Sequence, residues 1–169
     1  MGYVGSRSSH NTYLMANQLL GHSTAAAYIH VLSHGARCVE VDVWPSDKGL
    51  IVTHGHTLSK SVPFLDVCKA IGCSIVANDW PIFVSLECHV GVEGQPEMIN
   101  IMDQIWGDRL VKEVLHGTTP QRVSPQELKG KILLMVCWVL TWLHLLIRLT
   151  LGGILPCSSA RRSSRGCIF

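Results

Sequence analysis

Hydrophobic and polar positions follow two alternating periods along the first 134 residues. Apolar spacing is helical over 23–35, where Ser23 or Thr24 can accept the free N-terminal amide hydrogens and Gly35 can end the helix in a left-handed conformation. The period changes to two over 37–44, where valines alternate with polar residues, and this predicts a strand. The same reasoning predicts strands at 50–53, 82–86 and 131–134, helices at 63–72 and 96–106, and a short helical turn after a capping box at 124–127. Alternating strands and helices indicate an α/β fold with a parallel sheet.

The pattern changes abruptly after Leu134. Residues 135–155 are almost continuously apolar, and residues 156–169 form a Ser/Arg-rich tail without periodicity, which we expect to be disordered. The apolar segment could nearly span a bilayer, but His144 and Arg148 interrupt it and no caps flank it, so we do not expect a transmembrane anchor. Because Val136-Cys137 can be encoded by a common splice-donor sequence, we interpret residues 135–169 as translated intron.

Composition excludes several classes of protein. With 47% hydrophobic and only 15% charged residues, the chain would collapse and bury a core, so it is not a disordered protein. A net charge of +2 without a basic stripe along any predicted element gives no basis for a nucleic-acid partner. Its 169 residues are short of the roughly 250 of a complete (β/α)8 barrel. Seven scattered cysteines without a Cys-x-x-Cys pair favour reduced thiols in an intracellular protein.

Two acidic residues share one face of the predicted strand at 37–44. Glu40 and Asp42 lie opposite the valines, roughly 6.6 Å apart along the strand. Two like charges on a surface facing a cleft require a cation, and carboxylate oxygens suit Ca²⁺ or Mg²⁺ better than zinc. The alternative is a pair of ordinary surface acids on a solvent-facing edge, and these two residues alone leave both possibilities open.

Further polar residues close other apolar or strand-like segments. His10-Asn11, His54 and Glu87 occupy such positions, which gather at the carboxyl edge of a parallel sheet. Two imidazoles beside a metal held by carboxylates and an amide form an arrangement suited to phosphodiester cleavage. The other histidines are assigned no role, and zinc is not favoured because no cysteine lies at ligand spacing.

Five ordered segments together resemble a known family. They are residues 8–14 (Ser-Ser-His-Asn-Thr-Tyr-Leu), 38–44 (Cys-Val-Glu-Val-Asp-Val-Trp), 53–57 (Thr-His-Gly-His-Thr), 84–87 (Val-Ser-Leu-Glu) and 124–134 (Ser-Pro-Gln-Glu-Leu-Lys-Gly-Lys-Ile-Leu-Leu). In sequence and spacing these segments resemble the X region of eukaryotic phosphoinositide-specific phospholipase C. The resemblance covers residues 5–134, which we take as the catalytic domain.

The resemblance implies a fold, a cofactor and a reaction. The X region forms the first half of a distorted TIM-type (β/α)8 barrel, and a Y region supplies the second half. The implied Ca²⁺ ligands are Asn11, Glu40, Asp42 and Glu87. By the same resemblance, Glu40 takes the proton from the inositol 2-hydroxyl, His10 stabilises phosphoryl charge, and His54 protonates the departing diacylglycerol oxygen. The expected substrate is a phosphatidylinositol 4,5-bisphosphate-type lipid at the cytoplasmic membrane face, reached by a peripheral protein.

The chain also departs from the family pattern. Met135 and Cys137 occupy the positions of a Lys-x-Lys pair that holds the ring phosphates, so the substrate-binding residues are unknown here, and Cys88 replaces an asparagine. The Y half, a required partner, is missing. We therefore expect impaired activity. The alternatives are a glycerophosphodiester phosphodiesterase, whose motifs fit the segment around His10 poorly, and a non-catalytic fragment that binds a membrane or a partner.

Overall fold

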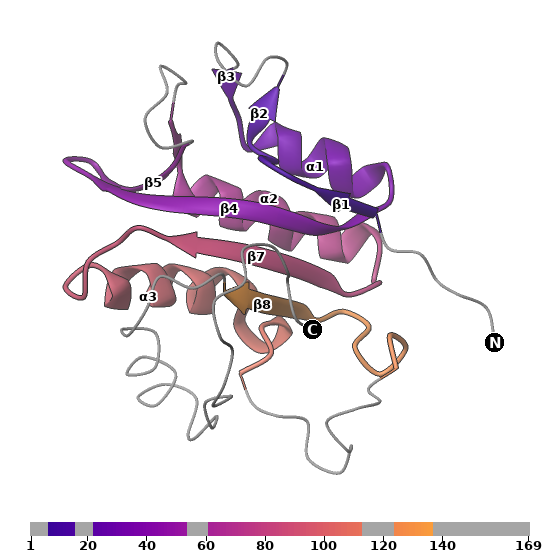
Figure 1. The fold of residues 1–169 in the computed structure, drawn as a ribbon. Coiled ribbons are helices and arrows are strands. Elements are labelled where there is room, and N and C mark those ends of the chain that lie inside the picture. Colours follow the sequence, from indigo (N-terminus) through magenta and orange to yellow (C-terminus); the bar gives the residue numbers. More distant parts are fainter. Residues whose placement is uncertain (1–6, 16–21, 54–60, 113–123, 137–169) are drawn as a thin grey trace, which may run out of the picture.

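The computed structural model describes residues 7–15, 22–53, 61–112 and 124–136 (Figure 1). Four parallel strands follow one another in chain order: β1 (Arg7–Ser9), β4 (Ala36–Ser46), β7 (Ile82–Cys88) and β8 (Ile132–Val136). Between them lie the helices α1 (Ala26–Ser33), α2 (Phe64–Ala77) and α3 (Gln95–Trp106). This succession of strand and helix is half of a (β/α)8 barrel, which confirms the predicted fold class.

Shorter elements extend the sheet at the far end of β4. Strand β5 (Gly49–Val52) pairs antiparallel with the last part of β4, and β6 (Val62–Pro63) pairs antiparallel with β5. A small separate ribbon consists of β2 (Leu14–Met15) and β3 (His22–Ser23), and a 3₁₀ turn, η1 (Gly107–Arg109), follows α3. These additions leave the parallel order β1–β4–β7–β8 intact.

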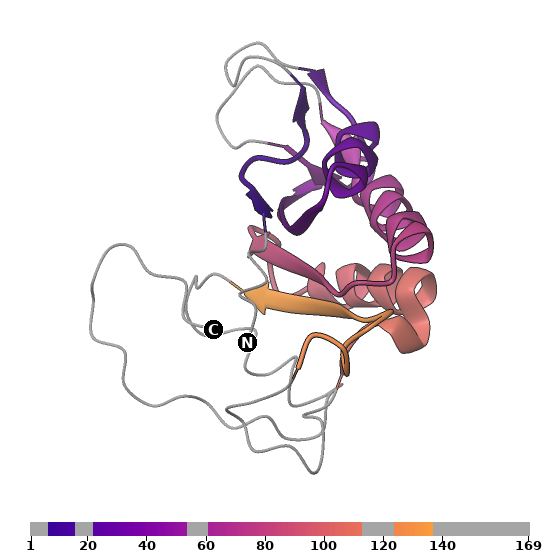
Figure 2. The ribbon, with the colours of Figure 1, turned by 90° about the vertical axis from the view of Figure 1, so that its right-hand side faces the viewer.

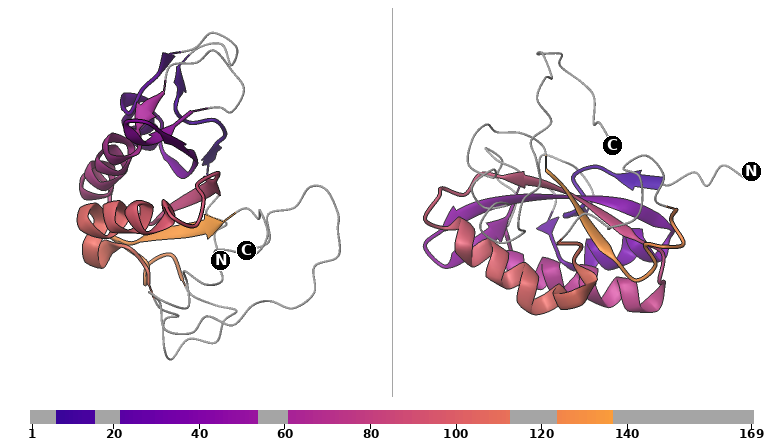
Figure 3. Two further views of the ribbon diagram at one scale, coloured as in Figure 1. Left: turned by 90° about the vertical axis from the view of Figure 1, so that its left-hand side faces the viewer. Right: turned by 90° about the horizontal axis from the view of Figure 1, so that it is seen from below.

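The helices cover one face of the sheet, as Figures 2 and 3 show. Val39, Val41 and Val43 of β4 are fully buried in the core that also contains helix residues such as Ile71. The indole Nε1 of Trp106 in α3 donates a hydrogen bond of 2.8 Å to the backbone oxygen of Cys68 in α2. Because side chains alternate along a strand, the valine face leaves the polar residues of β4 on the opposite face.

The predicted helix boundaries are partly correct. At the start of α1, Thr24 Oγ1 accepts the amide hydrogen of Ala26 at 3.2 Å as predicted, but the helix begins at Ala26 rather than at residue 23, because Ser23 belongs to β3 and Ala25 is the N-cap. Gly35 follows the helix with a φ of +91°, as predicted. The prediction that the second helix ends near Gly72 is wrong, because α2 continues to Ala77. Gly72 lies inside α2 on the side that faces α3, where a Cβ atom would lie 3.4 Å from the Trp106 ring, an ordinary contact distance.

Several sequence predictions fall at the end of the described chain or beyond it. At Ser124 the structure shows one of the two bonds of the predicted capping box, from the Ser124 amide to Glu127 Oε2 at 3.0 Å, and the Glu127 amide donates to the Ser124 backbone oxygen at 3.0 Å. Turns rather than a regular helix follow. His54, Cys137 and the tail after residue 136 lie outside the described residues. Among the residues that are described, no helix has the length and apolar character needed to cross a membrane.

Candidate active site

Strand register brings the predicted site residues together. Ser9 of β1 is the partner of Val39 in β4, so the chain leaving β1 places His10 and Asn11 beside Glu40. Asp42 of β4 is the direct partner of Glu87 in β7. In the parallel sheet, partner residues point to the same face, and the acidic residues therefore converge from two neighbouring strands.

The three acidic side chains form one cluster. One carboxylate oxygen from each of Glu40, Asp42 and Glu87 lies within 4.8 Å of the others. Glu40 and Asp42 are only 9% and 6% exposed, which rules out the alternative of two ordinary surface acids. Buried like charges repel one another strongly, and a bound cation relieves this repulsion.

Asn11 holds Glu40 through its backbone. Its φ of +48° lies in the left-handed region, which asparagine tolerates better than most residues. In this conformation its amide hydrogen is donated to Glu40 Oε2 at 2.6 Å, and its carbonyl accepts the amide of Leu14 at 3.0 Å. The unusual backbone at Asn11 thus directs a hydrogen-bond donor at the carboxylate.

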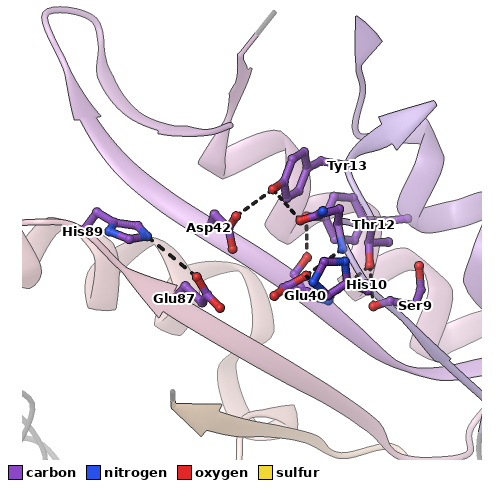
Figure 4. Close-up of polar contacts among 10 residues, drawn as sticks. Ser9, His10, Thr12, Tyr13, Glu40, Asp42, Glu87 and His89 are labelled. Atoms are coloured by element: carbon purple, nitrogen blue, oxygen red, sulfur yellow. Dashed lines mark hydrogen bonds and ion pairs between the residues drawn. The ribbon is translucent and has the colours of Figure 1, made fainter. Parts of the chain in front are cut away.

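Two hydroxyl groups to which the sequence pattern assigned no role also contact the site (Figure 4). Thr12 Oγ1 accepts the backbone amide of Glu40 at 3.1 Å and donates to the Ser9 carbonyl at 3.1 Å. The hydroxyl of Tyr13 lies 2.6 Å from Asp42 Oδ2 and 3.0 Å from Asn11 Oδ1. Their position next to His10-Asn11 in the motif at 8–14 was the available signal, but only the folded chain shows which carboxylate each hydroxyl serves.

Burial controls the protonation of these groups. It raises the pKa of Glu40; the Asn11 amide and His10 oppose this rise, while the charges of Asp42 and Glu87 reinforce it. Burial, followed by the hydrogen bond to Asp42, also raises the pKa of Tyr13 far above its ordinary value. The phenol therefore keeps its hydrogen and acts as a donor toward the carboxylate.

One histidine lies at each end of the acidic cluster. His10 Nε2 is 3.8 Å from Glu40 Oε2, and the His10 side chain is 76% exposed. His89 Nε2 is 3.8 Å from Glu87 Oε2, and its ring stacks on Trp44 with centroids 3.9 Å apart. The sequence pattern assigned no role to His89, because a single histidine after a strand does not by itself indicate a site. Figure 4 shows both imidazoles directed toward the carboxylates.

The structure describes two residues that depart from the family pattern, Cys88 at the end of β7 and Met135 in β8. Cys88 follows Glu87, and its thiol lies 3.8 Å from the Val90 carbonyl; burial raises the thiol pKa. Met135 of β8 is the partner of Ser85, which in turn is the partner of Glu40. Because partners in a parallel sheet share a face, Met135 points to the same side as Glu40, and its thioether offers neither a charge nor a hydrogen-bond donor.

The donor set fits a hard cation. Three carboxylates, with the amide of Asn11 beside them, provide the oxygen ligands that Ca²⁺ prefers, and no soft ligand takes part in the described cluster. Partial exposure of the Glu87 side chain leaves one side of the cluster open to a ligand. The arrangement can therefore hold a metal ion next to an accessible histidine.

Comparison with known proteins identifies sequence relatives. Residues 3–137 match the family described as phosphatidylinositol-specific phospholipase C, X domain. The chain is 46% identical over 129 residues to 1-phosphatidylinositol 4,5-bisphosphate phosphodiesterase delta-4 of Bos taurus, and 43% identical over 129 residues to the eta-1 protein of Homo sapiens. These alignments cover 75% of this chain but only 16% and 8% of the relatives, so the chain spans less than a fifth of their length.

Solved structures agree with the fold. The crystal structure of L. pealei PLC21 has a TM-score of 0.72 and 36% identity, covering 76% of this chain and 17% of that chain. A calcium-dependent phosphoinositol-specific phospholipase C from Pseudomonas sp. has a TM-score of 0.55 at 14% identity, covering 76% of this chain and 54% of that chain, and supports the fold alone. The family match also decides against the alternative family of glycerophosphodiester phosphodiesterases. The chain belongs to the phosphatidylinositol-specific phospholipase C X-domain family.

Proposed function

We propose that this chain carries the calcium-binding and acid–base half of a phosphoinositide phospholipase C active site. The observation that carries the proposal is the cluster of Glu40, Asp42 and Glu87, whose oxygens lie within 4.8 Å of one another. The fourth ligand is the side-chain oxygen of Asn11, the residue whose backbone amide donates to Glu40. When bound, Ca²⁺ would supply charge that stabilises the phosphoryl group and acidifies the attacking hydroxyl.

The residues divide the proton transfers between them. Glu40, whose pKa burial raises, takes the proton from the inositol 2-hydroxyl. That oxygen attacks phosphorus, the bond from phosphorus to the diacylglycerol oxygen breaks, and His54 donates a proton to the departing oxygen. His10, exposed beside Glu40, donates a hydrogen bond to the phosphoryl oxygens. Water then opens the cyclic phosphodiester to an inositol phosphate.

The substrate we propose is a phosphatidylinositol 4,5-bisphosphate-type lipid at the cytoplasmic membrane face. This follows from the relatives, whose names specify 1-phosphatidylinositol 4,5-bisphosphate as the molecule they cleave. The protein would act peripherally on the lipid surface. With Met135 on the same face as Glu40, this face lacks a cationic side chain at the position where the family has a lysine, so we expect weak binding of the ring phosphates.

A second half-barrel is the partner that this function requires. Strand β8 is the last strand of the described sheet, and Leu110 bridges only its first residue, Ile132. Closing the barrel would pair the remaining edge and complete the substrate site. The chain alone should therefore turn over substrate slowly.

The test is Ca²⁺-dependent release of inositol phosphate from vesicles that contain phosphatidylinositol 4,5-bisphosphate, measured with the 169-residue protein. Glu40→Gln keeps the shape of the side chain but removes its charge, and we expect a fall of about 100-fold or more. His10→Ala should reduce the rate similarly. Asp66→Asn is the matched control: it removes an exposed acid on α2 that pairs with Lys69, and turnover should not change.

Three outcomes would contradict parts of the proposal. Equal turnover by the wild type and Glu40→Gln would refute the role of the cluster. Rapid turnover by the chain alone would refute the claim that it is impaired. Vesicle binding without any Ca²⁺-dependent release would favour the non-catalytic alternative.

A further inference from the structure

Tyr13 is a buried aromatic residue that contacts the candidate metal centre without belonging to it. Its side chain is completely buried and forms part of the hydrophobic core, which fixes the position of the ring. It follows β1 in the chain, whereas the acid that it contacts, Asp42, lies on β4, 29 positions away. The contact therefore joins two segments that only the fold brings together.

We propose that Tyr13 is a positioning residue that orients Asp42 for binding a divalent cation. Its hydroxyl is 2.6 Å from Asp42 Oδ2 and 3.0 Å from Asn11 Oδ1, so one oxygen atom contacts two of the proposed ligands. A phenol has a single hydrogen, and the shorter contact, to the carboxylate, takes it.

A hydrogen bond from the fixed Tyr13 ring restricts the Asp42 carboxylate before a cation binds, so that cation binding costs less conformational entropy. A free carboxylate samples several rotations, whereas a hydrogen bond from a ring locked in the core selects one. The hydrogen bond acts on Asp42, so loss of the Tyr13 hydroxyl should weaken cation binding through this ligand. The inference rests on the proposed function, because it assumes that the acidic cluster binds Ca²⁺.

The structure offers a matched comparison in Tyr28. This residue of α1 is also completely buried, and its hydroxyl donates to the backbone oxygen of Glu40 at 2.9 Å. Its hydrogen bond reaches the main chain, whereas that of Tyr13 reaches the carboxylate of Asp42. Removing either hydroxyl therefore deletes one buried hydrogen bond, but only the loss at Tyr13 frees a ligand side chain.

The experiment is calorimetric titration of CaCl₂ into the full 169-residue chain, comparing the wild type, Tyr13→Phe and Tyr28→Phe. We expect Tyr13→Phe to weaken Ca²⁺ binding by about 10–100-fold, as is typical when the hydrogen-bond partner of a ligand is removed. Tyr28→Phe should bind within about threefold of the wild type, because the Tyr28 hydroxyl contacts only the main chain of Glu40 and no ligand side chain. Thermal denaturation without calcium should show similar losses for the two variants, because each deletes one buried hydrogen bond.

A second measurement on the wild type does not depend on how well the variant folds. The chain has three tyrosines, so labelling the phenol carbon gives at most three NMR signals, assigned with the two variants or by through-bond transfer. The Tyr13 signal should shift with the same Ca²⁺ midpoint as the calorimetric titration, and the Tyr28 signal should shift less.

The outcomes separate this inference from the function on which it rests. If the wild type binds no Ca²⁺, the proposed metal centre is wrong. If the wild type binds Ca²⁺ but Tyr13→Phe binds within threefold of it, or if the Tyr13 signal does not respond, the positioning role is wrong and the metal centre stands.

Discussion

The carboxyl group of Glu40 links the stability of the fold to pH. Burial raises its pKa above the ordinary value of 4.5, with Asp42 and Glu87 adding to the rise. At pH values between the pKa of Glu40 in the unfolded chain and its higher pKa in the folded protein, the folded state binds more protons than the unfolded chain. The free energy of unfolding therefore falls as pH rises through this window, and a cation at the cluster should oppose the fall.

We predict that Glu40→Gln removes this part of the pH dependence. Without calcium, the stability of the variant relative to the wild type should increase from about pH 4 to about pH 8, because the wild type must ionise a buried carboxyl group. The measurement is urea denaturation of both proteins across that range in EGTA. With saturating CaCl₂ at high pH, the wild type should instead be more stable than Glu40→Gln, since only the wild type keeps all three carboxylates that bind the cation. A constant difference across the range would show that Glu40 does not titrate differently in the folded state.

At the scale of elements, two glycines differ in whether the backbone requires them. Gly35 follows α1 with a φ of +91°, a conformation that other residues adopt only with strain. Gly72 lies inside α2, where a Cβ atom would meet the Trp106 ring at 3.4 Å, an ordinary contact distance. The first glycine is required by the backbone, whereas the second only lowers helix propensity.

We therefore predict opposite effects of the same substitution. Gly35→Ala should destabilise the protein by about 1 kcal/mol through backbone strain. Gly72→Ala should stabilise it by up to about 1 kcal/mol, because alanine favours the helix and reduces the freedom of the unfolded chain. Urea denaturation measures both changes. Destabilisation by Gly72→Ala would mean that α3 packs too closely against α2 to admit a methyl group.

At the scale of the whole molecule, the described sheet is an open half-barrel. Its fourth parallel strand, β8, pairs with β7 along one edge. Outside this pairing, the described part of the chain shows one isolated β-bridge to β8, between Leu110 and Ile132. Closed barrels have no free edges, and exposed edges promote association with other chains. The stability and activity of this protein should therefore depend on a second half.

We predict that co-expression with a Y region, the second half-barrel that the proposed function requires, increases Ca²⁺-dependent turnover by at least about tenfold, because it would complete the phosphate site and cover the edge of β8. Co-purification and inositol phosphate release measure the effect.

In the same complex, Met135→Lys should raise turnover further, since residue 135 shares a face with Glu40. The same complex carrying His10→Ala is the control and should stay nearly inactive. A second half that co-purifies without raising turnover would count against complementation at the active site.

Much of the local architecture followed from the sequence because it depends on local patterning. The alternation of Val39, Val41 and Val43 with polar residues predicted β4 and the face that carries its acids, and Thr24 and Gly35 marked the ends of α1. The end of α2 was predicted wrongly, because Gly72 was interpreted by its intrinsic propensity to end a helix. The helix continues past Gly72 because α2 packs against α3, and this packing is not visible in a local pattern.

The sequence by itself determined which residue types could form a site: acids in alternation on one strand, polar residues at the ends of others, and five motifs in family order. Only the tertiary structure decided that Asp42 pairs with Glu87, that Asn11 turns its amide toward Glu40, and that Tyr13 and His89 contact the cluster. The physical reason is that register and burial come from packing between segments distant in the chain. A period of two places a side chain on a face, but only the neighbouring strand and the helices behind it determine what that side chain meets.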